Sequence, residues 1–446
     1  LKYKSKSQLL WVDELENMRC MKWKLKPHSC LKHKFEDFLK EDVLFIYAWL
    51  GYSVILAIVY WWLPASFESN WLYFFTYLFE NGALPYIDSR VGYPPLGFLI
   101  YLPLAKLSSG NLKTFMYSFR FLNAIFLLIS QLLIYKIVKR IHGKRDALIA
   151  ALTLFSLPSM ALLSRFSNDV LSLFTTLLAL YFLIERRIEA AGISIGIAAM
   201  VKGIPGLLIL PALAWLRRFD ERYKLFTSAA ITVFVISLPF LIADPFMYIS
   251  VYTHHGDRGP WETIWALVDG WLSHGGFIHP DFDQFIYQTQ LRKIYPLRPN
   301  DHAFYAWKYQ MLPTILPILE AISVVVPTYL LRRKEVEVDS KSLLECVGAV
   351  FLGYILFFKG YSPQFTVFIL PMVLVSLKGL KSVVLGVFLE VATELRGIIC
   401  NALDCISRNI RIQMLEFTVL LRTITLAFAF IILFVKLYEG RVRKDA

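Results

Sequence analysis

The chain has 446 residues, of which 57% are hydrophobic and 15% aromatic, and its formal net charge is +13 at pH 7. Soluble domains contain about 45–50% apolar residues. The composition therefore excludes a soluble globular protein and indicates a polytopic membrane protein.

Residues 1–42 form a basic arm ahead of the first apolar run. The first forty residues contain ten Lys or Arg against five Asp or Glu. This balance predicts a cytoplasmic arm that contacts anionic lipid headgroups, and no binding of nucleic acid. The five cysteines have no metal-ligand spacing, and their odd number argues against a disulfide framework.

Apolar runs that are long enough, or nearly so, to cross about 30 Å of hydrocarbon recur along the chain. They are residues 43–63, 115–135, 146–163, 169–184, 225–247, 308–331, 343–358, 363–377 and 412–436. When the basic loops between them are placed inside, both termini are also inside and eleven or twelve crossings result. We expect an all-α polytopic membrane protein with one transmembrane domain over 43–436 and a cytoplasmic tail over 437–446.

Residues 64–114 are predicted to form a large first external loop. The arm and the basic segment 136–145 both lie inside, so only two full crossings fit between them. The fourteen residues from Pro94 to Leu107 are too few to span, and the prolines interrupt a helix. We therefore expect re-entrant or juxtamembrane helices there. Irregular backbone at membrane depth must be buried or line a watery cavity, which indicates a site.

Residues 190–216 are predicted to form a hairpin that returns to the cytoplasmic side. Basic residues flank both ends, and Gly203, Pro205 and Gly206 mark the bend. At about 1.5 Å per residue, each arm reaches only part of the way across the bilayer. Lys202 lies at the tip, and a lysine at this depth is a candidate functional residue.

Two further external segments follow. Residues 248–306 are rich in His, Trp, Tyr and Asp and are expected to cover the outer face. Residues 359–365 form a short external loop between two apolar runs. The amphipathic region 381–411 is not assigned as spanning or peripheral.

On this topology the polar residues gather on the outer side. They are Glu68, Asp88, Arg90, Arg165, Asn168, Asp169, Lys202, His254, His255, Arg258, Glu262, Lys359 and Gln364. Carboxylates, cations and imidazoles beside lipid suit transfer of a sugar carried on a lipid phosphate. The leaving phosphate needs positive charge, and the attacking hydroxyl needs a base.

Five motifs resemble those of GT-C superfamily glycosyltransferases over about residues 43–375. The first-loop segment Gly82-Ala-Leu-Pro-Tyr-Ile-Asp88, followed by Tyr93-Pro-Pro-Leu, is similar to the signature of that superfamily. So are Ser167-Asn-Asp169 at a helix start and the hairpin Gly196 to Pro211. His255-Gly-Asp-Arg258-Gly-Pro-Trp-Glu262 and Lys359-Gly-Tyr-Ser-Pro-Gln-Phe365 resemble the branch that uses polyprenyl-phosphate mannose.

The resemblance implies a GT-C-type bundle and inverting transfer of a hexose, with mannose the first candidate. The donor would be a polyprenyl-phosphate sugar, and the acceptor a lipid-linked or surface glycan on the outer or lumenal face. The membrane would be the plasma membrane in a prokaryote or the endoplasmic reticulum in a eukaryote. No cofactor is expected and no metal ligand set is assigned, although a divalent metal is left open.

The resemblance also implies site residues. Glu68 or Asp88 is the candidate base, since Glu68 stands where the superfamily carries an early Asp. The donor phosphate would contact Lys202, His255, Arg258 and His254. The substrate-binding candidates are Arg90, Tyr93, Asn168, Asp169, Glu262, Lys359 and Gln364.

Simpler interpretations stand beside these. Asp169 is placed to cap a helix, and Arg258 is placed to pair with Glu262 four residues later. Tyr93-Pro-Pro-Leu fits an architectural break that seats a short helix. For the whole chain, the alternatives are a non-catalytic subunit of a glycosylation complex and a transporter or flippase of lipid-linked saccharides.

Overall fold

The computed structural model describes residues 42–62, 86, 93–109, 111–165, 167–249, 252, 260–269, 311–333, 339–401 and 408–442. The chain divides into two compact units, 1–54 and 55–446. The boundary lies inside the first described helix, α3 (Val43–Trp62). The predicted single domain over 43–436 stays a prediction.

The described chain is helical, and its only β-type pairing is one isolated bridge between Trp261 and Gly360. The helices after α3 are α5 (Leu96–Leu99), α6 (Leu102–Ser108), α7 (Leu112–His142), α8 (Lys144–Ser156), α9 (Pro158–Ser164), α10 (Asp169–Ile184), α11 (Ile188–Val201), η1 (Ile204–Leu208), α12 (Ile209–Trp215), α13 (Phe219–Ala243), α15 (Ile264–Asp269), α17 (Leu312–Arg333), α18 (Ser340–Phe357), η3 (Pro363–Phe365), α19 (Thr366–Ser376), α20 (Leu380–Asn401) and α21 (Arg408–Val442).

Six of the described helices are long and apolar enough to cross a membrane. A seventh span results if α8 and α9, which meet at a bend of 60°, form one broken span. The all-α polytopic class is therefore confirmed. Five shorter apolar helices of 10–17 residues lie among them, including α10 and α11. The predicted number of eleven or twelve crossings stays a prediction.

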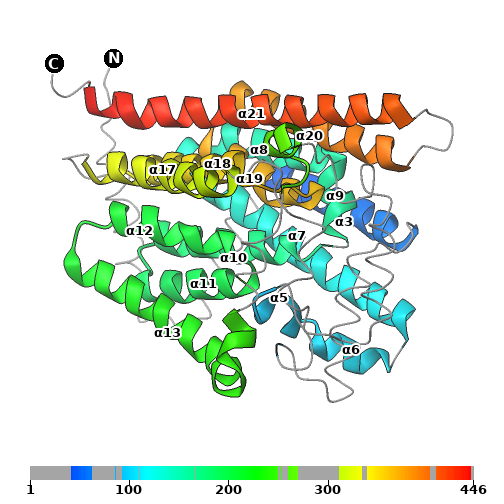
Figure 1. Ribbon diagram of the computed structural model, residues 1–446, viewed down its shortest axis with the longest axis horizontal. Helices are drawn as coiled ribbons and strands as arrows, with labels where there is room; N and C mark the ends of the chain where they lie inside the picture. The colour runs from blue at the N-terminus through cyan, green and yellow to red at the C-terminus, as the bar shows by residue number, and fades with distance from the viewer. Residues whose placement is uncertain are drawn as a thin grey trace. The chain divides into compact units, whose positions relative to one another are not determined.

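The predicted hairpin over 190–216 is present as α11, η1 and α12. The helix is interrupted at Lys202 and Gly203, which is where the tip of the hairpin was predicted. Along one side α11 packs between α10 and α13, as Figure 1 shows in green. Gly192 makes this packing possible, because a Cβ there would lie 2.0 Å from Ser228 Oγ and 2.5 Å from the Leu225 carbonyl oxygen.

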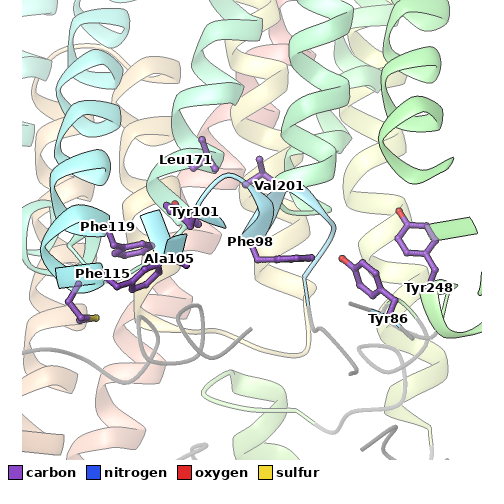
Figure 2. Close-up of a cluster of buried hydrophobic side chains, with 10 residues drawn as sticks. Tyr86, Phe98, Tyr101, Ala105, Phe115, Phe119, Leu171, Val201 and Tyr248 are labelled. Atoms are coloured by element: carbon purple, nitrogen blue, oxygen red, sulfur yellow. The ribbon is translucent and has the colours of Figure 1, made fainter. Parts of the chain in front are cut away.

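The short helices α5 and α6 lie in the predicted first external loop, in the part where re-entrant helices were expected. A buried aromatic cluster attaches them to the ends of the longer helices, with members Tyr86, Phe98, Tyr101, Ala105, Phe115, Met116, Phe119, Leu171, Val201 and Tyr248. Figure 2 shows the Phe98 ring extending toward Tyr86, and Tyr101 lying near Leu171. The cluster fixes the loop beside the starts of α7 and α10 and the end of α11.

Candidate active site

Lys202 and Asp169 meet where two helices end. Asp169 is the first residue of α10, and Lys202 follows α11 in an extended conformation. Lys202 Nζ lies 2.5 Å from Asp169 Oδ1, and the two side chains are 17% and 2% exposed. Asp169 Oδ2 also accepts a hydrogen bond of 2.6 Å from Ser167 Oγ. The side chain of Asp169 therefore pairs with the Lys202 ammonium group and does not cap α10, so the capping interpretation is wrong.

A small pocket surrounds this ion pair. Its lining consists of Asp169, Ser172, Lys202, Ile204, Pro205, Ile355, Phe365, Phe368 and Ile369. Lys202 Nζ lies 4.4 Å from the centre of the Phe365 ring, a distance suited to a cation–π contact. Apart from the ion pair and Ser172 the walls are apolar, and charges interact more strongly in such surroundings than in water. The pocket therefore presents one ammonium group in largely apolar surroundings.

Ser172 is a polar group of the pocket that the sequence did not single out. It lies one turn after Asp169 on α10 and is 1% exposed. Its Oγ is buried and has no hydrogen-bond partner among the residues that the structure describes. Most buried hydroxyls are paired. An unpaired hydroxyl beside Lys202 is therefore a candidate contact for a substrate oxygen.

The chain turn before α10 is held in place by Asn123 of α7. Its side-chain nitrogen donates to the carbonyl oxygens of Ser164 and Ser167 at 2.9 and 3.1 Å. Its side-chain oxygen accepts from the Tyr101 hydroxyl at 3.1 Å. Asn123 thus connects Tyr101, in the predicted first external loop, to the residues that precede Asp169.

Asn168 and Tyr93 have structural contacts beside the pocket. Asn168 Nδ2 donates to the Gly97 carbonyl at 3.1 Å, and the Tyr93 carbonyl accepts from the Tyr86 hydroxyl at 2.5 Å. A Cβ at Gly97 would lie 2.7 Å from the Val201 carbonyl oxygen. The turn at Tyr93-Pro-Pro-Leu is therefore packed tightly against the end of α11. This arrangement agrees with the architectural interpretation of that motif.

Two motifs predicted to be external are paired through their backbones. Trp261 N donates to the Lys359 carbonyl at 3.1 Å, and Tyr361 N donates to the Trp261 carbonyl at 2.9 Å. Thr263 Oγ1 adds a bond of 3.0 Å to the Lys359 carbonyl. We call residues 261–263 together with 359–362 the loop seam. The seam joins the second segment predicted to be external to the residues that precede Phe365.

Glu262 lies in the seam and is 1% exposed. Its two carboxylate oxygens accept from Arg396 of α20, at 2.6 Å from Nη2 and 3.2 Å from Nε. Its carbonyl accepts from Arg422 of α21. The sequence suggested Arg258 as a partner, but Arg258 lies outside the described residues. Neither Arg396 nor Arg422 was singled out from the sequence, because no local pattern links them to Glu262.

Lys359 and Gln364 do not line the pocket. The side chain of Lys359 is 8% exposed, and its charge interacts with Glu320 of α17. Gln364 is half-buried in η3, directly before Phe365. Gln364 therefore precedes the residue whose ring faces the Lys202 ammonium group, whereas Lys359 interacts with α17.

The remaining candidates, Glu68, Asp88, Arg90, His254, His255 and Arg258, lie outside the described residues. The structure therefore does not place either candidate base. Within the described ranges, no group of three or more His, Cys, Asp or Glu is arranged to hold a metal ion.

Comparisons with known proteins concern the middle of the chain and its fold. Residues 92–268 match the model of glycosyltransferase family 87, a range that includes Asp169, Lys202 and Glu262. No curated protein matches the chain.

Solved structures that are similar to this chain include the following two. ArnT from Cupriavidus metallidurans bound to undecaprenyl phosphate is 16% identical with a TM-score of 0.40, over 90% of this chain and 78% of that chain. The Archaeoglobus fulgidus oligosaccharyltransferase in its apo form is 13% identical with a TM-score of 0.39, over 85% of this chain and 56% of that one. The chain is thus similar to glycosyltransferase family 87 across residues 92–268.

Proposed function

We propose that the protein is an integral-membrane glycosyltransferase that uses a polyprenyl-phosphate-linked hexose, with mannose as the first candidate. The acceptor is a hydroxyl of a lipid-linked or surface glycan, and the reaction takes place on the outer or lumenal face. The similarity to glycosyltransferase family 87 supports the reaction class. The motifs in the first loop, the hairpin and the two later external segments support the donor class.

The observation that carries this proposal is the placement of Lys202. Its ammonium group lies at a helix break, 2.5 Å from Asp169, in a pocket with apolar walls. A phosphate ester that leaves with an extra negative charge is stabilised most by a fixed cation in water-poor surroundings. Lys202 has three donor hydrogens, so one can bind Asp169 while others face a phosphate oxygen.

The proposed step is an inverting displacement. The acceptor oxygen forms a bond to the anomeric carbon while the bond from that carbon to the phosphate oxygen breaks. The phosphate oxygen keeps the bonding electron pair and leaves as polyprenyl phosphate, next to Lys202. The acceptor proton passes to a carboxylate, for which Glu68 and Asp88 are the candidates. Asp169 orients Lys202, and His254, His255 and Arg258 are further candidates for the phosphate.

Sugar transfer by the full-length protein in lipid nanodiscs tests this function. The donor is synthetic polyprenyl-phosphate mannose, and several glycolipid acceptors are supplied, with and without Mg²⁺ or Mn²⁺. We expect transfer by the wild type and at least a hundredfold loss in Lys202→Met. Lys113→Met is the matched control, since Lys113 is exposed at the start of α7. Equal rates in both variants would contradict the role of Lys202.

Glu68→Gln and Asp88→Asn identify the base. Loss of transfer in one variant, with donor binding retained, assigns that carboxylate. Wild-type protein that binds donor but transfers no sugar would favour a non-catalytic subunit. Movement of the intact lipid-linked sugar across the bilayer, without transfer, would favour a flippase.

A further inference from the structure

The loop seam is attached by arginines to two helices, α20 and α21. Arg396 of α20 holds both carboxylate oxygens of Glu262, and Arg422 of α21 donates to its carbonyl. The Arg422 guanidinium also lies 3.7 Å from the centre of the Tyr361 ring, on the other side of the seam. Two cations from distant parts of the chain thus hold one short segment.

This attachment is buried. Glu262 and Arg422 are 1% and 2% exposed, and the Arg396 side chain is 24% exposed. Removing one partner of a buried pair leaves the other charge without compensation, which is costly. Glu262 also has a φ of 48°, in the left-handed region that non-glycine residues seldom adopt. Such a conformation persists only where the surroundings hold it.

Two residues of the seam, Tyr361 and Ser362, contact Phe365, which lines the pocket. Phe365 N donates to the Ser362 carbonyl at 2.9 Å, and Trp261 Nε1 donates to Ser362 Oγ at 3.3 Å. The Tyr361 and Phe365 rings lie 5.6 Å apart. Phe365 is the ring that faces Lys202 Nζ at 4.4 Å.

A second connection joins the same segment to α20. The Tyr361 hydroxyl lies 3.0 Å from Thr366 Oγ1, which lies 2.9 Å from Thr393 Oγ1. Thr393 is three residues before Arg396 on α20. One face of α20 therefore fixes both Glu262 and the start of α19.

We infer that Arg396 is a positioning residue of the pocket, supported by Arg422, and that both act through Glu262 and Tyr361. By holding the seam they set the position of Phe365 against Lys202. Glu262 thus fixes the position of the second external segment and does not itself contact substrate. The effect on activity rests on the proposed glycosyltransferase function, whereas the effect on the seam does not.

The first test measures the seam itself. A Gln364→Cys reporter is placed in full-length protein whose natural cysteines are changed to Ser, and its labelling rate with a water-soluble maleimide is measured in nanodiscs. We expect Arg396→Gln and Glu262→Gln each to raise the rate at least fivefold. Their combination should equal either single variant, because both break the same contact. Arg186→Gln is the control, since Arg186 stacks on Trp215 at 4.1 Å, far along the hairpin from Lys202.

The second test measures donor use. We expect Arg396→Gln to raise the KM for polyprenyl-phosphate mannose at least fivefold and to leave the acceptor KM within twofold. Arg396→Lys keeps the charge but loses the two-pronged contact, so an intermediate KM is expected. If Arg396→Gln does not fold, Arg396→Lys and the double variant Glu262→Gln/Arg396→Gln give the same comparison.

Labelling within twofold of wild type in folded Arg396 variants would overturn the inference. So would an unchanged labelling rate combined with a raised acceptor KM, because that result indicates direct substrate contact by Glu262. If wild-type protein transfers no sugar, the labelling result still decides whether Arg396 holds the seam. The failure of the proposed function and the failure of this inference are therefore separate outcomes.

Discussion

Lys202 Nζ lies 2.5 Å from Asp169 Oδ1, although the two residues are 33 positions apart in sequence. Each stands at the end of a helix, and each comes from a motif that was singled out separately. A lysine side chain that is only 17% exposed needs a counter-charge, and Asp169 supplies it. The pair is therefore both a structural contact between α10 and α11 and the candidate contact for a leaving phosphate.

This dual role predicts different effects on stability and activity. Asp169→Asn leaves Lys202 without its partner, so we expect a loss of about 3 kcal/mol in unfolding free energy. Lys202→Met leaves a buried carboxylate and should cost a similar amount. The double variant Asp169→Asn/Lys202→Met removes both charges and should be more stable than either single variant. Thermal unfolding in nanodiscs measures the order.

Activity should not follow stability in this series. All three variants are expected to lose at least a hundredfold in sugar transfer. Lys202→Met and the double variant lack the ammonium group, and Asp169→Asn leaves that group without the partner that orients it. Recovery of transfer together with stability in the double variant would show that the pair is structural only. Lys113→Met again serves as the control for loss of a lysine near the same end of the bundle.

The helices and the hairpin tip followed from local features of the sequence, because glycines, prolines and charge asymmetry act within a few residues. The start and end of α10 agree with the predicted run 169–184. The link between Glu262 and Arg396 did not follow, since the two residues are 134 positions apart and α20 was left unassigned. The unpaired hydroxyl of Ser172 could not be predicted from the sequence either, because a serine in an apolar helix ordinarily bonds to its own backbone.

Ser172 gives a second prediction, in which stability and activity change in opposite directions. Its buried Oγ has no partner among the described residues, and an unsatisfied buried hydroxyl costs about 1–3 kcal/mol. Ser172→Ala should therefore raise the unfolding temperature while it raises the donor KM about threefold or more. Ser130→Ala is the control, because Ser130 Oγ already donates to the Phe126 carbonyl at 2.7 Å. A less stable Ser172→Ala protein with an unchanged KM would contradict this reading of the pocket.

Asn123 gives a third prediction, which concerns the turn before Asp169. Asn123→Ala removes the donor to Ser164 and Ser167 and the acceptor for Tyr101, all of them buried. We expect a loss of about 2–4 kcal/mol in unfolding free energy, because several buried polar groups lose their partner. Asn111→Ala, which removes an exposed cap of α7, should cost only about 1 kcal/mol. Equal losses in the two variants, measured by thermal unfolding, would contradict the inference that Asn123 fixes the turn before Asp169.

The fourth prediction compares two glycines whose surroundings differ. A Cβ at Gly360 would lie 2.2 Å from the Trp261 ring, whereas a Cβ at Gly203 meets nothing within 4 Å. Gly360→Ala should therefore open the loop seam and increase labelling of a Gln364→Cys reporter. Gly203→Ala should leave both labelling and stability close to wild type, although it lies next to Lys202. Because the two changes add the same methyl group, a similar response in both variants would show that the seam does not constrain Gln364.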